Sequence, residues 1–249
     1  WRALQPGQFS RLHQKLCVVD GLHGFIGGIN VLDDRHDLNH GWVDAPRLDF
    51  AVALGGPVVL QMEHAVRAVW TRAALGADWP EEVLNVARSA EPLARARRVL
   101  SRLRMLAPAA PKTTASLAPV RVAFLVRDNL RRRRSIEQAY IEAIGRARQR
   151  VDLACPYFYP GRVFMRTLRD AARRGVKVRL LLQGKPDYRF AVLAAEVLYD
   201  ELLASGVRVF EYTPAFLHAK VAVVDDDWAT VGSSNIDPLS LLLNLEANV

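Results

Sequence analysis

The chain has 249 residues, of which 51% are hydrophobic and 24% are charged. This is the balance of a globular protein with a sizeable core, and it excludes a disordered or fibrous chain. The formal net charge of +8 favours a polyanionic partner, which could be nucleic acid, anionic lipid or another phosphate ester. No apolar run of the sequence reaches the ~20 residues that a membrane span needs. Because the chain begins at Trp1 and stops within a pattern at Val249, we expect it to be a fragment.

In chain order, the segments alternate between strand and helix patterns, apart from an Ala- and Arg-rich stretch at 80–118 that has the composition of a linker. Helices that alternate with strands rich in Val and Leu predict an α/β sandwich with a mostly buried sheet. The predicted strands are 48–54, 120–126, 151–157, 176–184 and 207–212, and the predicted helices are one that opens at Pro57, then 135–149, 162–175 and 190–205.

One stretch of the chain occurs twice. "HQKLCVVDGLHGFIGGIN" (13–30) aligns without a gap on "HAKVAVVDDDWATVGSSN" (218–235) at an offset of 205, which is 218 minus 13. Chance rarely produces so many matches, so the chain carries two copies of one unit. The identical pairs are His13/His218, Lys15/Lys220, Val18/Val223, Val19/Val224, Asp20/Asp225, Gly27/Gly232 and Asn30/Asn235.

Each copy has the pattern of a β-hairpin. Residues 218–224 alternate as a strand, so His218 and Lys220 point to the same face. A turn centred between Asp226 and Asp227 then brings Asn235 back opposite His218. In the first copy the turn falls at residues 21–22, and Asn30 returns opposite His13. Each hairpin therefore gathers imidazole, ammonium and carboxamide groups at one place.

This set of groups suits a phosphate. Lysine and asparagine supply donors to phosphoryl oxygens, and histidine can act as nucleophile or as general acid and base near neutral pH. Two copies face to face would place histidines on opposite sides of one phosphorus, which allows in-line displacement without a metal or cofactor. For a single His-x-Lys the better interpretation would be a solvated strand edge. Asp226 and Asp227 are more simply turn residues than metal ligands, and for Cys17 and Cys155 we expect buried free thiols.

The doubled His-x-Lys-x4-Asp…Gly-(Gly/Ser)-x-Asn motif resembles the phospholipase D superfamily. "FIGGIN", "YFYPG", "LRDAARRGVKVRLLLQG", "GVRVFEY" and "IDPLSLLLNLEAN" are similar to segments of bacterial cardiolipin synthases, most of all the B type. The resemblance implies a pseudo-symmetric α/β fold of two halves with the active site at their interface. It divides the chain into part of the first half (1–79), a variable linker (80–118) and the second half without its last strands (119–249).

The resemblance also implies phosphatidyl transfer through a phosphohistidine. His13 is then the nucleophile, and His218 is the acid that protonates the leaving alcohol and later the base for the acceptor. Asp20 and Asp225 complete the motifs and, at the turns, would brace them. The implied catalytic set is His13, Lys15, Asp20, His218, Lys220 and Asp225, with Asn30, Asn235 and Ser233 binding the substrate phosphate.

The family further places an acidic residue downstream of each motif, where it orients a histidine ring. Glu246 in "NLEAN" matches this position after the second motif, and Asp49 in "RLDFAV" is chosen after the first. Asp49 follows Asn30 by 19 residues (49 minus 30), whereas Glu246 follows Asn235 by 11 (246 minus 235), so the spacings differ.

The expected partners are phospholipid substrates, phosphatidylglycerol with phosphatidylethanolamine as an alternative, and an anionic membrane surface, with no nucleic acid required. The expected location is the bacterial inner membrane, with the protein peripheral or anchored by a segment outside the fragment. The preferred interpretation of the run Arg131–Arg134 is a solvent-exposed face. The alternative is a contact with anionic lipid, which contributes ~1 kcal/mol of binding free energy per basic residue. The rival functions are a phospholipase D-type hydrolase or nuclease, and a non-catalytic membrane-binding member.

Overall fold

The computed structural model describes residues 11–37, 40–75, 88, 91, 120–185 and 196–249. The chain divides into two compact units. One unit comprises Trp1–Lys15, Ile26–Val52 and Val122–Val249, and the other comprises Leu16–Phe25 and Ala53–Arg121. The predicted linker at 80–118 lies outside the described residues, apart from 88 and 91.

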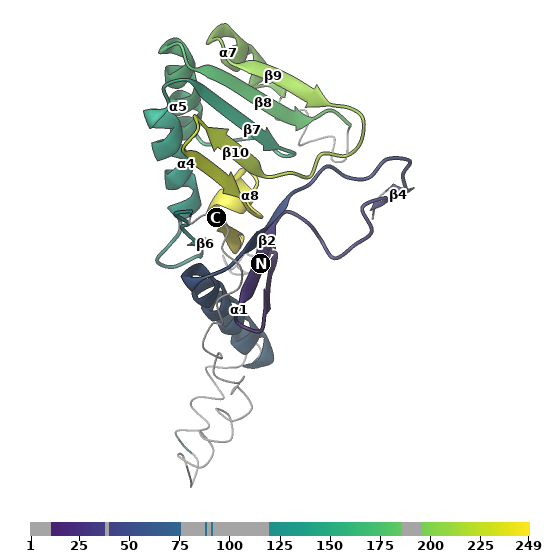
Figure 1. The fold of residues 1–249 in the computed structure, drawn as a ribbon. Coiled ribbons are helices and arrows are strands. Elements are labelled where there is room, and N and C mark those ends of the chain that lie inside the picture. The colour runs from purple at the N-terminus through teal and green to yellow at the C-terminus, as the bar shows by residue number, and fades with distance from the viewer. Residues whose placement is uncertain (1–10, 38–39, 76–87, 89–90, 92–119, 186–195) are drawn as a thin grey trace, which may run out of the picture. The chain divides into compact units, whose positions relative to one another are not determined.

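The larger unit is built on a five-stranded sheet in the order β11-β10-β7-β8-β9 (Figure 1). The strands β7, β8 and β9 pair in parallel, and β10 pairs antiparallel with both β7 and β11. Helices connect the parallel strands, as βαβ units require. The elements are α4 (Ser135–Arg146), β7 (Arg150–Cys155), α5 (Arg162–Arg173), β8 (Lys177–Gln183), α7 (Tyr199–Ala204), β9 (Arg208–Tyr212), β10 (Val221–Val224) and β11 (Trp228–Val231).

The core of this unit lies between the sheet and the helices α4 and α5 (Figure 1). Every second residue of β7 and β8 is buried, which is the alternation expected when one face of a sheet is covered. The residues that meet in this core include Val151, Leu153, Val178, Leu180 and Leu182 from the strands and Ile136, Tyr140, Ile144, Phe164 and Leu168 from the helices. This packing holds the end of β7 and the start of β10, where the second motif begins.

Four shorter strands and one short helix also contribute to the larger unit. β6 (Leu125–Arg127) pairs antiparallel with β12 (Glu246–Asn248), so Arg127 lies opposite Glu246. β3 (His36–Asp37) and β4 (Gly41–Trp42) form a small ladder. The helix α8 (Pro238–Leu242) starts at Asp237, whose side chain accepts from the N–H groups of Leu239 and Ser240.

The smaller unit contains β1 (Leu16–Val19), the start of β2 (His23–Gly27), the end of β5 (Ala51–Leu54) and α1 (Pro57–Leu75). The three strands form a sheet in the order β1-β2-β5. The strand β2 and the helix α1 approach closely at Gly24, where a Cβ would lie 2.7 Å from the sulfur of Met62. Within the described ranges, no helix combines the length and the apolarity needed to cross a membrane.

The predicted alternation of strands and helices is confirmed, with differences at the boundaries. The helix predicted to reach 149 ends at Arg146, because the N–H groups of residues 148–150 donate to the Asp225 carboxylate instead of continuing the helix. The strand predicted at 120–126 is reduced to β6, since β12 offers only three residues to pair with. The helix predicted at 190–205 is described only as α7, and residues 190–195 lie outside the described residues.

The expectation for the cysteines is half right. Cys155 is a buried free thiol, whereas Cys17 is a free thiol that is exposed. Cys17 occupies an outward position of β1, where alternate residues are exposed, so its apolar neighbours in the sequence do not cover it.

Replacing a leucine at the centre of the core should destabilise the protein strongly. Leu180→Ala in β8 removes a side chain that is 0% exposed, and we expect a loss of about 2–5 kcal/mol in the free energy of unfolding. The matched control is Leu203→Ala in α7, where the side chain is 53% exposed and the change should stay within about 0.5 kcal/mol. Urea denaturation measures both, and equal losses would contradict the core described above.

Candidate active site

Two residues that occupy equivalent positions in the two motifs share an unusual backbone conformation. Asp20 has φ 54° and Asp225 has φ 50°, and no other described non-glycine residue has a positive φ. Aspartate is one of the few side chains that tolerate this left-handed region, which closes a tight turn. The two copies of the motif therefore turn in the same way, as their sequence identity predicts.

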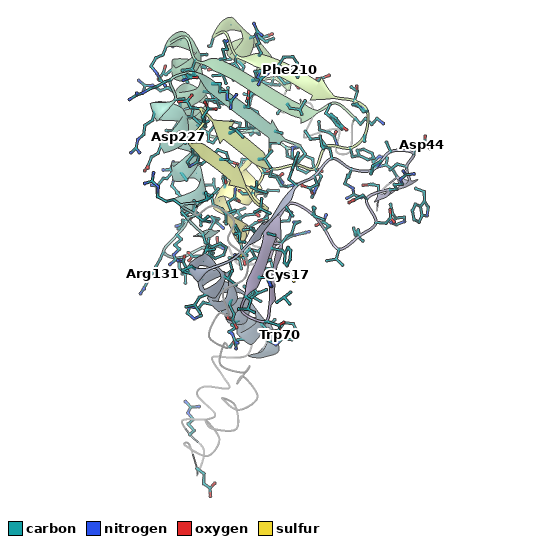
Figure 2. All side chains as sticks on the ribbon, in the orientation of Figure 1. Cys17, Asp44, Trp70, Arg131, Phe210 and Asp227 are labelled. Atoms are coloured by element: carbon teal, nitrogen blue, oxygen red, sulfur yellow. The ribbon has the colours of Figure 1, made fainter. Side chains whose placement is uncertain are left out.

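Asp225 braces its turn with its carboxylate. Its two oxygens accept from the backbone N–H groups of Arg148, Gln149 and Arg150 at 2.8–2.9 Å. These donors hold the pKa of Asp225 below its usual value. Figure 2 labels Asp227 at the same turn, and β10 separates this turn from Lys220 by about 16 Å at ~3.3 Å per residue. This places the Asp225 carboxylate away from the imidazole and ammonium groups of its own motif.

Each histidine contacts a carboxylate through its Nδ1 atom. His13 Nδ1 lies 2.9 Å from Glu246 Oε2, and His218 Nδ1 lies 2.6 Å from Asp49 Oδ2. The side chains of Glu246 and Asp49 are 0% and 5% exposed, so both contacts are shielded from water. Occupation of Nδ1 leaves Nε2 of each ring available for chemistry.

The contacts are exchanged between the motifs. The resemblance placed one acid downstream of each motif. In the structure, Glu246, after the second motif, contacts His13 of the first, and Asp49, after the first motif, contacts His218 of the second. The longer gap before Asp49 is explained by the β3–β4 ladder, which lies between Asn30 and Asp49.

The backbone repeats this exchange. His13 N donates to Leu245 O at 3.0 Å, and His218 N donates to Leu48 O at 2.8 Å. In return, Leu245 N donates to Arg11 O, and Leu48 N donates to Phe216 O. The two parallel bridges that result are Leu12 with Leu245 and Leu48 with Leu217. In both cases, a pair of main-chain hydrogen bonds therefore positions the acid beside its histidine.

The two lysines lie beside the histidines. Lys15 Nζ donates to the carbonyl of His13 at 3.0 Å, and Lys220 Nζ donates to the carbonyl of His218. Burial lowers the pKa of Lys15, and it lowers the pKa of Lys220, which is 1% exposed, to about 8. Burial also lowers the pKa of His218 to about 4, although its contact with Asp49 acts in the opposite direction.

The predicted phosphate-binding residues differ in their surroundings. Asn235 is buried, and its Oδ1 has no hydrogen-bond partner among the described atoms. Asn30 is half-buried at the end of the first motif. Ser233, the third predicted phosphate-binding residue, is 0% exposed, and its Oγ donates to Glu246 Oε2. Its hydroxyl thus supports the carboxylate that contacts His13.

Gly28, which sequence reasoning missed, is the counterpart of Ser233 in the first motif (233 minus 205). A Cβ on Gly28 would lie 2.2 Å from Asp49 Oδ1, so no side chain fits there. Glycine stands beside the shorter acid, Asp49, and serine stands beside the longer acid, Glu246. The alignment of Gly28 on Ser233 was the signal in the sequence, but its meaning depended on the position of Asp49.

The two motifs supply groups that suit an anion. A buried ammonium group, a half-buried one, two imidazole Nε2 atoms and an asparagine amide are groups that bind phosphoryl oxygens or transfer protons to them. Within the described part of the chain, no three His, Cys, Asp or Glu side chains are grouped so that they could hold a metal ion.

A side chain at Gly28 should disturb Asp49. We expect Gly28→Ala to lower the free energy of unfolding by about 1–3 kcal/mol, because its Cβ overlaps the carboxylate. Gly55→Ala is the matched control, since its Cβ would meet nothing within 4 Å. Urea denaturation gives the stabilities, and the NMR signal of the His218 imidazole reports the contact with Asp49. An unchanged signal in Gly28→Ala would contradict this account.

Comparisons with known proteins agree with the motif. Residues 140–249 match the family described as "Cardiolipin synthase, PLD-like domain". The chain is 39% identical over 246 residues to Cardiolipin synthase B of Escherichia coli (strain K12), which covers 99% of this chain and 53% of the relative. It is 37% identical over 236 residues to Cardiolipin synthase A of Pseudomonas fluorescens, covering 95% and 43%.

The chain thus spans about half the length of the curated relatives that it matches. A solved structure, phosphatidylserine synthase from Haemophilus influenzae Rd KW20, shares the fold with a TM-score of 0.57 at 16% identity, over 96% of this chain and 57% of that one. The predicted α/β fold class is therefore confirmed. Residues 140–249 thus match a phospholipase D-like cardiolipin synthase domain, and nearly the whole chain, with its doubled His-x-Lys motif, is similar to bacterial cardiolipin synthases.

Proposed function

We propose that the protein is a phosphatidyltransferase that makes cardiolipin from two phospholipids. The observation that carries the proposal is the pair of histidines, each held at Nδ1 by a buried carboxylate and each accompanied by a lysine that donates to its carbonyl. The similarity to cardiolipin synthases supports phospholipid substrates, and we propose phosphatidylglycerol as the donor, with phosphatidylethanolamine as an alternative.

The reaction proceeds in two displacements at phosphorus. His13 Nε2 attacks the phosphodiester and forms a nitrogen–phosphorus bond while the bond to the leaving alcohol breaks. His218 gives its Nε2 proton to that alcohol, then takes a proton from the hydroxyl of a second lipid. This hydroxyl oxygen attacks the phosphohistidine, which releases His13 and forms the new phosphodiester.

The general-acid role of His218 depends on its surroundings. With a pKa lowered to about 4 by burial, the imidazole is neutral at pH 7 in the empty site. A bound phosphate anion raises this pKa, in addition to the contribution of Asp49, because opposite charges favour the protonated ring. Substrate binding would thus prepare His218 to give up a proton.

The remaining groups would hold the phosphoryl oxygens. Donors from both motifs are Lys15, Lys220, Asn30 and Asn235. Because Lys220 is buried, its low-dielectric surroundings strengthen its attraction for the phosphoryl oxygens. The reaction needs no metal ion in this scheme. The net charge of +8 suits an anionic membrane surface, and we place the protein at the bacterial inner membrane.

Liposomes that contain phosphatidylglycerol test the proposal. The intact natural protein, assayed with EDTA present, should produce a four-chain lipid detected by mass spectrometry. His13→Ala and His218→Ala should each abolish this product, because each removes one side of the displacement. His64→Ala is the matched control, since His64 is exposed on α1.

Three outcomes would contradict the proposal. Normal turnover by either active-site variant would rule out the two-histidine mechanism. Release of phosphatidic acid alone would favour the hydrolase. A strict requirement for a divalent ion would exclude the metal-free scheme.

The lysine pKa predicts the alkaline limb of the pH profile. Because the pKa of Lys220 is lowered to about 8, its ammonium is charged below that pH and loses its proton above it. We therefore expect kcat/KM to fall as the pH rises through about 8. Lys220→Arg should move the limb upward, since a guanidinium stays protonated. Lys185→Arg, at an exposed lysine, serves as the control, and an unmoved limb in Lys220→Arg would contradict the assignment.

A further inference from the structure

Arg127 is a buried cation that the proposed mechanism does not use. It is 1% exposed, and within the described residues it forms no ion pair with a carboxylate. Its guanidinium donates instead to three main-chain carbonyls: Nε to Arg133, Nη1 to Asn244 and Nη2 to Leu242. A buried charge is costly unless it is fully hydrogen-bonded, so this cation ties its carbonyl partners firmly in place.

Two of these carbonyls belong to the turn that leads to Glu246. Leu242 is the last residue of α8, where carbonyls without helical partners and the negative end of the helix dipole favour a cation. Asn244 follows two residues later, directly before Leu245 and Glu246. Arg127 thus fixes both ends of the short segment that joins α8 to β12.

The same segment contacts His13 through both its main chain and its imidazole. Leu245 exchanges main-chain hydrogen bonds with residues 11 and 13, and Glu246 contacts the imidazole. Arg127 is also the cross-strand partner of Glu246 in the β6–β12 ladder and attracts its carboxylate electrostatically. Glu246 Oε1 has no hydrogen-bond partner among the described atoms, and the contacts of this carboxylate with His13 and Ser233 are both at Oε2.

We propose that Arg127 is a positioning residue: its guanidinium shapes the segment 242–246 so that Glu246 meets His13, and it has no such link to Asp49 and His218. The proposal rests on the proposed function, in which His13 forms the phosphohistidine. Lysine cannot replace the guanidinium fork, because its single ammonium cannot reach three carbonyls in a fixed plane.

The chain offers a matched control in Arg174. Its Nη2 donates to the carbonyls of Ile144 and Gly145 in the last turn of α4 and of Ala147 directly after it, so it too caps a helix C-terminus. Unlike the segment capped by Arg127, this one leads to neither acid. Arg174→Gln should therefore cost stability without a specific effect on His13.

A double-mutant cycle in the intact natural protein tests the proposal. Arg127→Gln should lower kcat at least ~tenfold, with a smaller change in KM, because a misplaced carboxylate no longer orients the nucleophile. On a Glu246→Gln background the same change should cost less than ~twofold further, since the two residues act as one unit. On an Asp49→Asn background, Arg127→Gln should again lower kcat at least ~tenfold, because the two residues act independently.

A second readout does not depend on activity. The NMR signal of the His13 Nδ1 proton, which reports its hydrogen bond to Glu246, should be lost in Arg127→Gln and kept in Arg174→Gln. The corresponding His218 signal should be kept in both variants. If Arg127→Gln does not fold, Arg127→Lys serves in its place, and thermal unfolding establishes folding for every variant.

Two results would overturn the proposal: an unchanged His13 signal in the Arg127 variant, or an equal loss of kcat on the Glu246→Gln and Asp49→Asn backgrounds. Failure of the proposed function looks different, because the wild-type protein would then yield no four-chain lipid. The His13 signal still decides the role of Arg127 in that case.

Discussion

The site depends on the exchange of two carboxylates between two copies of one motif. Glu246 reaches His13 across 233 residues of sequence, and Asp49 reaches His218 across 169. Each contact is accompanied by a parallel bridge that aligns the backbone of the histidine with the backbone before the acid. Neither imidazole can therefore be oriented by its own hairpin, and the reactive geometry exists only when the distant segments have met.

Burial gives this geometry its electrostatic character. Lys15 and Lys220 donate to the carbonyls of the neighbouring histidines, and desolvation lowers the pKa values of both lysines. Desolvation likewise lowers the pKa of His218. An anion near the two ammonium groups would offset this cost of desolvation, because opposite charges favour the protonated lysines.

The sequence could predict what is local. Alternation of strands and helices, the paired hairpins and the turn at Asp225 depend on neighbouring residues, and the structure contains them. The partner of each acid, the need for glycine at position 28 and the exposure of Cys17 depend on tertiary contacts that no spacing reveals. The catalytic roles remain predictions, because they concern a substrate.

Gly28 beside Asp49 and Ser233 beside Glu246 bear on how such a chain could have evolved. Reciprocal contacts of this kind are what a symmetric dimer of a one-motif protein would contain, with each subunit lending its acid to the other. Duplication and fusion of the gene would preserve both contacts while allowing the copies to diverge. Substitutions at the acid and at the small residue beside it would then depend on each other. In this chain the glycine, Gly28, lies beside the shorter acid, Asp49, and the serine, Ser233, lies beside the longer acid, Glu246.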